Sequence, residues 1–165
     1  MTDKLITFTL WAFVINLGVV LGAGLYESRI EAPRWLSADG DGALRWNRDV
    51  AVAANVGLRF WVYVSTIPLT LLTLGSLVLL WQAPDPVRGW WMAAALVALI
   101  DRTMTFSYFI PSMLKLMTEG IYGEAEAAAK ACLWLKLAWV RHAADLAALA
   151  AGLQAFASWH ARSGR

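Results

Sequence analysis

Among the charged residues near or inside the long apolar stretches of this sequence, two carboxylates and two arginines are candidates for a catalytic site. They are Asp101, Glu27, Arg59 and Arg141. A charge in the hydrocarbon of a bilayer costs at least about 2.5–3.5 kcal/mol, so ionisable residues there usually face a protected interior and serve a function. A carboxylate can act as a general base, and a nearby guanidinium can stabilise the anion that forms. We therefore predict a catalytic pair of Asp101 with Arg59 or Arg141, or of Glu27 with Arg59, in which the carboxylate is the base.

Other polar and aromatic residues repeat on the same helical faces, at about 100° per residue. We expect these residues to line a substrate site: Asn16, Asn55, Tyr63, Thr105, Tyr108, Trp134, His142 and Asp145. Arg102 falls just outside the polar face of its helix, and Arg141 and Asp145 have the i,i+4 spacing of an ion pair. The alternative is that the polar residues only hold the helices together.

The remaining residue types argue against several kinds of site. The single Cys132 excludes a disulfide within the chain and a cysteine-based metal cluster. Two histidines make a metal site unexpected, and the arrangement left open joins His142 to Asp145, Asp101 or Glu27. No Ser-His-Asp arrangement stands out, no strands are apparent, and we expect no cofactor. A net charge of +2 without a Lys/Arg run offers no surface for nucleic acid.

The elements that must position these residues are four long apolar helices. Of the 165 residues, 59% are hydrophobic and 16% charged, so the chain is too short to hide its apolar surface from water by folding on itself. A helix needs about 20 residues to cross a bilayer. We predict spans at about 5–26, 50–81, 86–118 and 125–159. The expected fold is all-α, a four-helix transmembrane bundle with a polar interior, and residues 1–165 form one integral membrane domain.

The longest connection, about Ser28 to Asp49, is the most charged segment of the chain. Its Asp39-Gly40-Asp41-Gly42 repeat lacks the rest of a calcium loop and is interpreted as a turn. Basic residues are shared almost evenly between the two ends of the predicted helices, so the positive-inside rule leaves the orientation open.

Prolines interrupt the second and third predicted helices. Pro68 and Pro111 each remove a backbone hydrogen bond and free the carbonyl four residues earlier, at Val64 and Ser107. Kinks there would widen the bundle beside the aromatic residues around Ser107. This favours a flat, aromatic-lined pocket for a hydrophobic ligand with a polar end. A packing kink without a ligand is the alternative.

Gly18 and Gly22 form a small-residue motif on a helical face turned away from the polar residues. The motif leaves two interpretations open, a homodimer contact and a tight contact within the bundle.

Four motifs occur in one order along the chain. They are Gly22-Ala23-Gly24-Leu25-Tyr26-Glu27 before Pro33, Arg59-Phe60-Trp61, Thr105-Phe106-Ser107-Tyr108-Phe109-Ile110-Pro111, and Trp134, Trp139 and Arg141 before an alanine-rich helix. In order and spacing they resemble the anthrone oxygenase-like family of small four-helix membrane proteins, long catalogued as a domain of unknown function. The positions that look like family positions are Pro33, Pro111, Trp134 and Arg141.

This resemblance implies a multi-pass membrane protein and an oxygenase that needs no metal or flavin. In such a reaction a base removes an acidic C–H proton from a flat polycyclic phenol, and the carbanion reacts with dioxygen to give a quinone. We therefore expect a multi-pass protein of a bacterial inner membrane, a membrane-embedded oxidoreductase whose partners are the lipid bilayer and a hydrophobic aromatic or quinone-like molecule. The alternative is a non-catalytic membrane protein that binds a lipid or small molecule, or a helper subunit.

Overall fold

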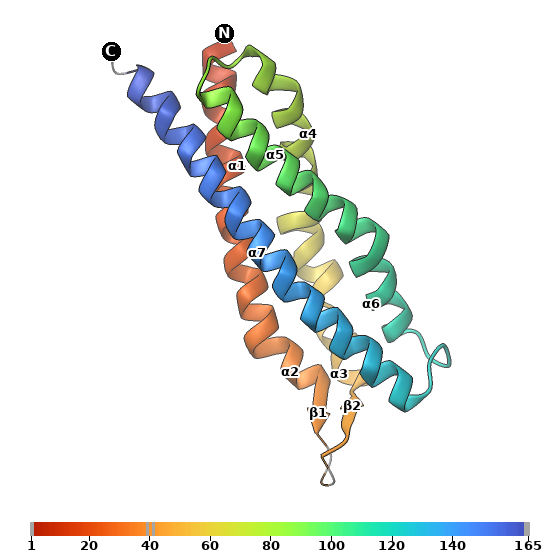
Figure 1. Cartoon of the computed structure of the whole chain (residues 1–165). Helices are drawn as coiled ribbons and strands as arrows, with labels where there is room; N and C mark the ends of the chain where they lie inside the picture. Colours follow the sequence, from red (N-terminus) through yellow and green to blue (C-terminus); the bar gives the residue numbers. More distant parts are fainter. Residues whose placement is uncertain (1, 39, 41, 164–165) are drawn as a thin grey trace.

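The structure is a computed structural model that describes residues 2–38, 40 and 42–163. Within these residues the chain forms four helical rods and one short hairpin (Figure 1). The first rod joins α1 (Thr2–Tyr26), η1 (Glu27–Glu31) and α2 (Ala32–Trp35); the second joins η2 (Gly57–Thr66), α4 (Ile67–Leu79) and η3 (Leu80–Gln82); the third joins α5 (Val87–Met104), η4 (Thr105–Phe109) and α6 (Ile110–Met117); the fourth is α7 (Glu124–Ser163). The all-α prediction is confirmed.

The connection between the first two rods carries a β-hairpin, so the expectation that the chain has no strands is wrong. Strand β1 (Leu36–Ala38) pairs antiparallel with β2 (Leu44–Trp46), and Leu36 lies opposite Trp46. Asp39 and Asp41 of the predicted turn lie outside the described residues, while Gly42 has φ +82°, a conformation that suits glycine. Helix α3 (Arg48–Ala54) follows, and the Asn47 side chain accepts a hydrogen bond from the Val50 amide at its start.

The rods pack in a ring, in which α1 contacts α4 and α7, and α5 contacts the same two helices. Large apolar side chains such as Phe13, Leu17, Leu69 and Trp91 are almost fully buried in the half of the bundle that holds both chain termini (Figure 1). Both α5 and α7 place buried alanines in this core, and their small side chains let the two helices approach closely. The opposite half, near the hairpin, contains a pocket.

Each of the first three rods contains a π-helical segment directly before a proline. Segments η1, η2 and η4 precede Pro33, Pro68 and Pro111, which stand in the first turn of the helices that follow. Proline cannot donate to the carbonyl four residues earlier, and its ring crowds that carbonyl. The wider i→i+5 winding accommodates the proline without ending the rod, and such segments often mark functional sites.

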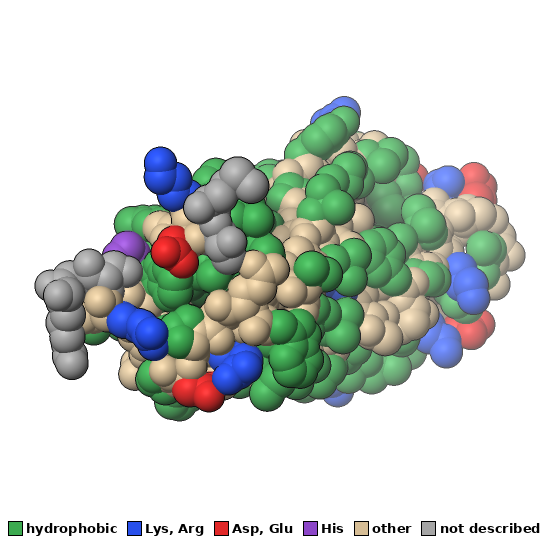
Figure 2. All heavy atoms as spheres, turned by 90° about the horizontal axis from the view of Figure 1, so that it is seen from above, with side chains coloured by type: hydrophobic (Ala, Val, Ile, Leu, Met, Phe, Trp, Pro, Cys, Tyr) green, Lys and Arg blue, Asp and Glu red, His purple; other side chains and the backbone are tan. Residues whose placement is uncertain are grey.

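The outside of the bundle is apolar and its inside holds charges. Exposed large apolar side chains occur along all four rods, including Phe8, Leu71 and Val140. Figure 2 shows charged side chains gathered toward the two ends of the molecule, with apolar side chains covering most of the length between them. Three helical segments are long and apolar enough to cross a membrane, namely Asp3–Trp35, Gly57–Gln82 and Val87–Met117.

Helix α7 is long enough to cross a membrane but is not among these three segments. Much of its length is alanine, which is less apolar than leucine, and Lys136, Arg141, His142 and Asp145 interrupt it. A fourth span in α7 therefore stays a prediction.

Candidate functional site

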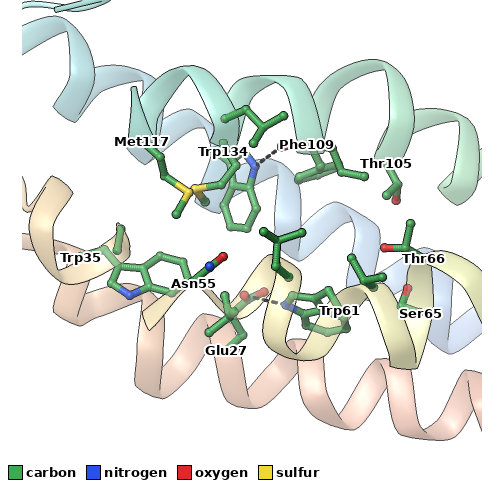
Figure 3. Close-up of a pocket in the computed structure, with 18 of the residues that line it drawn as sticks. Glu27, Trp35, Asn55, Trp61, Ser65, Thr66, Thr105, Phe109, Met117 and Trp134 are labelled. Carbon is green, nitrogen blue, oxygen red and sulfur yellow. Dashed lines mark hydrogen bonds between the residues drawn. The ribbon is translucent and has the colours of Figure 1, made fainter. Parts of the chain in front are cut away.

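A pocket of about 460 Å³ lies between η2 and the rod formed by η4 and α6, in the half of the bundle away from the termini. Trp35, Glu27 and Trp61 lie along one wall in Figure 3, and Phe109 and Trp134 lie along the opposite wall. The pocket is therefore aromatic on two sides, as a site for a flat hydrophobic molecule should be.

Glu27 is the only carboxylate among the described residues that line this pocket. It is buried, because it stands where α1 passes into η1 on the inner face of the rod. Trp61 donates from Nε1 to the Glu27 Oε1 atom over 2.8 Å (Figure 3). A carboxylate held in place by one hydrogen bond at the edge of a cavity can accept a proton from a molecule in that cavity.

Arg141 of α7 supplies the cation of the pocket. It is 8% exposed, and its Cζ atom lies 4.7 Å from the Phe109 ring centroid and 5.9 Å from that of Trp61, within the range of cation–π contacts. Its Nε atom is 3.6 Å from Asp101 Oδ1, too far for a hydrogen bond. No described residue accepts a hydrogen bond from this guanidinium. A guanidinium whose N–H groups have no acceptor can donate hydrogen bonds to an oxygen atom of a bound molecule.

Asp101 lies behind the pocket wall. It is 1% exposed, does not line the pocket, and accepts hydrogen bonds from Arg102, including one from Nε over 3.0 Å. Arg102 also donates from Nη1 to Ser65 Oγ over 2.8 Å. Arg102 is bonded to one oxygen of Asp101 and Arg141 lies beside the other. The predicted pairing of Asp101 with Arg141 is therefore present, while its role as a base stays a prediction.

His142 and Asp145 form a second buried polar group, between α1 and α7. His142 Nε2 is hydrogen-bonded to Ser28 Oγ at 2.8 Å, and Nδ1 is 4.0 Å from Asp145 Oδ2. A Cβ atom at Gly24 would lie 2.5 Å from the imidazole, so glycine makes room for the ring. This Ser-His-Asp grouping was not apparent in the sequence. His142 and Asp145 do not line the pocket, and their assignment to substrate binding stays a prediction. Asp145 faces His142 instead of forming the predicted pair with Arg141.

Two of the predicted site residues face outward. Arg59 is exposed, Tyr63 is 70% exposed, and neither lines the pocket. The predicted pairs of Arg59 with Glu27 or Asp101 are therefore wrong.

Asn16 and Tyr108 are half-buried but also lie outside the pocket lining. Asn16 donates from Nδ2 to the Val64 carbonyl over 2.8 Å, and this is the carbonyl that Pro68 was expected to free. Tyr108 packs edge-to-face against Phe109. Asn16 thus links two rods.

Three residues that were predicted to bind a substrate, Asn55, Thr105 and Trp134, line the pocket. Trp134 donates from Nε1 to the Phe109 carbonyl over 3.1 Å, while the buried Thr105 hydroxyl has no partner among the described residues. Figure 3 shows Thr105 near Ser65 and Thr66 at the end of the pocket opposite Trp35. The pocket thus has hydroxyl groups at its inner end.

The errors on the second rod have one cause, which is the assumption of a continuous α-helix over 50–81. Asn55 ends α3 with φ 44° and ψ 41°, a left-handed conformation that asparagine tolerates. The rod then restarts as η2, whose i→i+5 winding does not advance by 100° per residue. Ser65 and Trp61 therefore turn inward, where Arg59 and Tyr63 were expected.

The predicted site residues did not include Trp35, Trp61 and Phe109, which line the pocket, or Arg102, which pairs with Asp101 outside the pocket lining. The signal for Arg102 was its place next to Asp101 in an apolar stretch, since a buried carboxylate needs a cation. The signal for Trp61 and Phe109 was their place in π-helical segments before a proline, Pro68 and Pro111. Trp35 gave no signal beyond its residue type.

The described residues contain no group of three or more His, Cys, Asp or Glu side chains that could hold a metal ion. No protein-family model matches the chain, and no match is found among curated proteins or solved structures. The resemblance to the anthrone oxygenase-like family therefore stays a prediction.

Proposed function

We propose that the four rods form a transmembrane bundle around a polar interior. Exposed apolar side chains along α7, including Leu133, Val140, Leu146 and Leu153, support a fourth span beside the three apolar segments. The α7 charges Arg141 and Asp145 are buried within the bundle, where a charge in a membrane protein is tolerated. A bacterial inner membrane stays the expected location.

The pocket in this bundle binds a flat, hydrophobic molecule that carries at least one oxygen atom. The observation that carries this proposal is Arg141, a buried guanidinium without a hydrogen-bond acceptor among the described residues, in a pocket with aromatic walls. A ligand oxygen would supply the missing acceptor, and a charge-assisted bond of this kind is stronger than a neutral one.

The reaction that this arrangement supports best is a cofactor-independent oxygenation. Glu27 removes a proton from an acidic methylene group of the bound molecule, and Arg141 stabilises the enolate oxygen. The carbanion gives its electrons to dioxygen, a C–O bond forms, and loss of water from the hydroperoxide leaves a new carbonyl. The balance is one methylene compound and one dioxygen to one carbonyl compound and one water, so the enzyme needs no external reductant.

The test uses vesicles that contain the purified chain, with anthrone as the probe substrate and oxygen uptake and quinone formation as the readouts. We expect Glu27→Gln to lower kcat by about 10²–10⁴-fold, the usual contribution of a general base. Glu31→Gln is the matched control, because Glu31 lies in the same π-helical segment but pairs with Arg34 outside the pocket. Equal turnover in the two variants would contradict the role of Glu27.

A non-catalytic binding protein is the second candidate, and the position of Asp101 favours it. Its ion pairs with Arg102 and Arg141 account for three of the buried charges without any chemistry. For a binding protein, anthrone or a co-purified molecule would be retained through Arg141 without consumption of oxygen. If Arg141→Met loses binding of this molecule and Arg59→Met retains it, the pocket is the binding site.

A further inference from the structure

The end of the pocket nearest the hairpin is lined by Trp35 and Ala51, against which Trp46 of the β1–β2 hairpin packs. We call the hairpin, together with Asn47 and Arg48, the roof. Trp46 donates from Nε1 to the Leu116 carbonyl, and Arg48 donates from Nε to the Met117 carbonyl, each over 3.0 Å. The Asn47 amide donates to the Trp35 carbonyl over 2.6 Å. These bonds fasten the roof to the end of α6 and to the end of the first rod.

The side of the pocket between η2 and α6 is open and apolar. Five of the lining residues are exposed, and three of these carry large apolar side chains: Val52 at 41%, Leu58 at 66% and Leu114 at 60%. The other two are Gly57, which has no side chain, and Thr118, whose hydroxyl already donates to the Leu114 carbonyl over 2.8 Å. We call Val52, Leu58 and Leu114 the portal.

The portal has the apolar character of a membrane-facing surface and lacks the charged side chains expected at an entrance for water-soluble molecules. Leu58 and Leu114 belong to two of the segments that are apolar enough to cross a membrane, Gly57–Gln82 and Val87–Met117. No charged side chain among the described residues lines the mouth, and the charges of the pocket, Glu27 and Arg141, are buried behind it. Exposed apolar side chains around the mouth have a lower free energy in contact with acyl chains than in contact with water.

From this contrast we infer that the pocket takes its ligand sideways from the acyl-chain layer, through the portal and not through the roof. The inference rests on the proposed function and narrows its substrate class to molecules that are dissolved in the bilayer. Such a molecule enters with its polar end toward Arg141 and Glu27. Its apolar body then lies between Trp61, Phe109 and Trp134.

The test compares two fluorescent phenols with the same ring system. The first, 1-hydroxypyrene, dissolves in bilayers, and the second, 8-hydroxypyrene-1,3,6-trisulfonate, stays in water. Binding to the full chain in phosphatidylcholine vesicles is followed in a stopped-flow instrument by energy transfer from protein tryptophans to pyrene. We expect saturable binding of 1-hydroxypyrene and none of the trisulfonate.

The variants Leu58→Trp and Leu114→Trp narrow the portal, and we expect each to slow the association rate of 1-hydroxypyrene by about tenfold or more. Leu71→Trp is the matched control, because Leu71 is 64% exposed on the same rod but does not line the pocket. Its rate should equal that of the unmodified chain. Trp46→Phe loosens the roof and should also leave the rate unchanged. Rates, and not signal amplitudes, are compared, since three of these variants add a tryptophan and one removes a tryptophan.

The outcomes separate this inference from the proposed function. Saturable binding with rates that portal variants leave unchanged would overturn lateral entry and keep the binding site. Faster association in Trp46→Phe, or binding of the trisulfonate, would assign the entrance to the roof and also overturn lateral entry. An absence of saturable binding in the unmodified chain would refute the proposed ligand pocket, and the portal with it.

Discussion

Replacement of Gly24 by alanine tests the contact between α1 and α7 at the buried His142. An added Cβ atom would lie 2.5 Å from His142 Cε1 and 2.9 Å from Nδ1, closer than such atoms approach one another in proteins. The imidazole is 4% exposed and hydrogen-bonded to Ser28, so it cannot move away without breaking that bond. We therefore expect Gly24→Ala to destabilise the folded protein.

The magnitude follows from three contributions to the free energy of unfolding. Extra volume in a packed interior costs about 1–3 kcal/mol. Loss of the hydrogen bond between Ser28 and His142 adds about 0.5–1.5 kcal/mol. Alanine is favoured over glycine in a helix by about 1 kcal/mol, which offsets part of the loss. The net loss is about 2 kcal/mol, which corresponds to a fall in Tm of about 4–8 °C for a chain of this size.

The assay is thermal unfolding of the purified protein in one detergent, with Gly75→Ala as the control. Gly75 lies in α4, and a Cβ atom there meets nothing within 4 Å, so alanine should leave Tm unchanged or raise it. In a His142→Ala background the clash is absent, and Gly24→Ala should then cost nothing further. Equal Tm values for the two glycine variants, or the same fall in Tm with and without the imidazole, would refute the close contact.

Three further substitutions test the buried pairs and the roof. Arg102→Gln leaves the buried Asp101 without its partner and should lower the free energy of unfolding by about 3–5 kcal/mol. Arg59→Gln replaces an exposed residue and should change that free energy by less than about 0.5 kcal/mol in the same thermal assay. Equal effects of the two substitutions would contradict the inward position of Arg102. Trp61→Phe keeps an aromatic ring at this position but removes the N–H donor to Glu27, so we expect a loss of about 1.5–3 kcal/mol in the same assay. An unchanged Tm would argue against that bond. Trp46→Phe removes the bond to the end of α6, worth about 0.5–1.5 kcal/mol, and amide hydrogen exchange should become faster in α3 and stay the same in α7.

The composition and the apolar runs were enough to predict the helical rods. Apolar stretches of more than 20 residues with prolines and glycines at their ends leave the backbone few alternatives to a helix. The hairpin between Leu36 and Trp46 was not predicted, since two strands of three residues each give almost no periodic signal. Their pairing depends on contacts with α6 and α7 that the local sequence does not show.

The candidate site was predicted only in part. Predictions of which side chains face inward were right after regular α-helix and wrong after a break in the helix. Glu27 and Arg141 were expected to face the interior and do so, because each stands in a rod whose preceding turns are regular α-helix. Arg59 and Tyr63 were expected to face the interior and do not, because the left-handed Asn55 and the π-helical winding of η2 change the phase of the rod. A fixed angle per residue carries no information across such a break.

The sequence by itself determined that this chain forms apolar helices whose buried charges must find partners, since that follows from residue type and from the cost of a charge away from water. Which charges meet was decided by the tertiary structure alone. Asp101 pairs with Arg102, whereas Arg141 lies against the aromatic rings of the pocket without a hydrogen-bond acceptor. This arrangement arises because rods from distant parts of the chain meet there, and their π-helical segments change which side chains face inward. Pairing between rods depends on their rotation and separation, and these quantities are set by packing across the whole bundle.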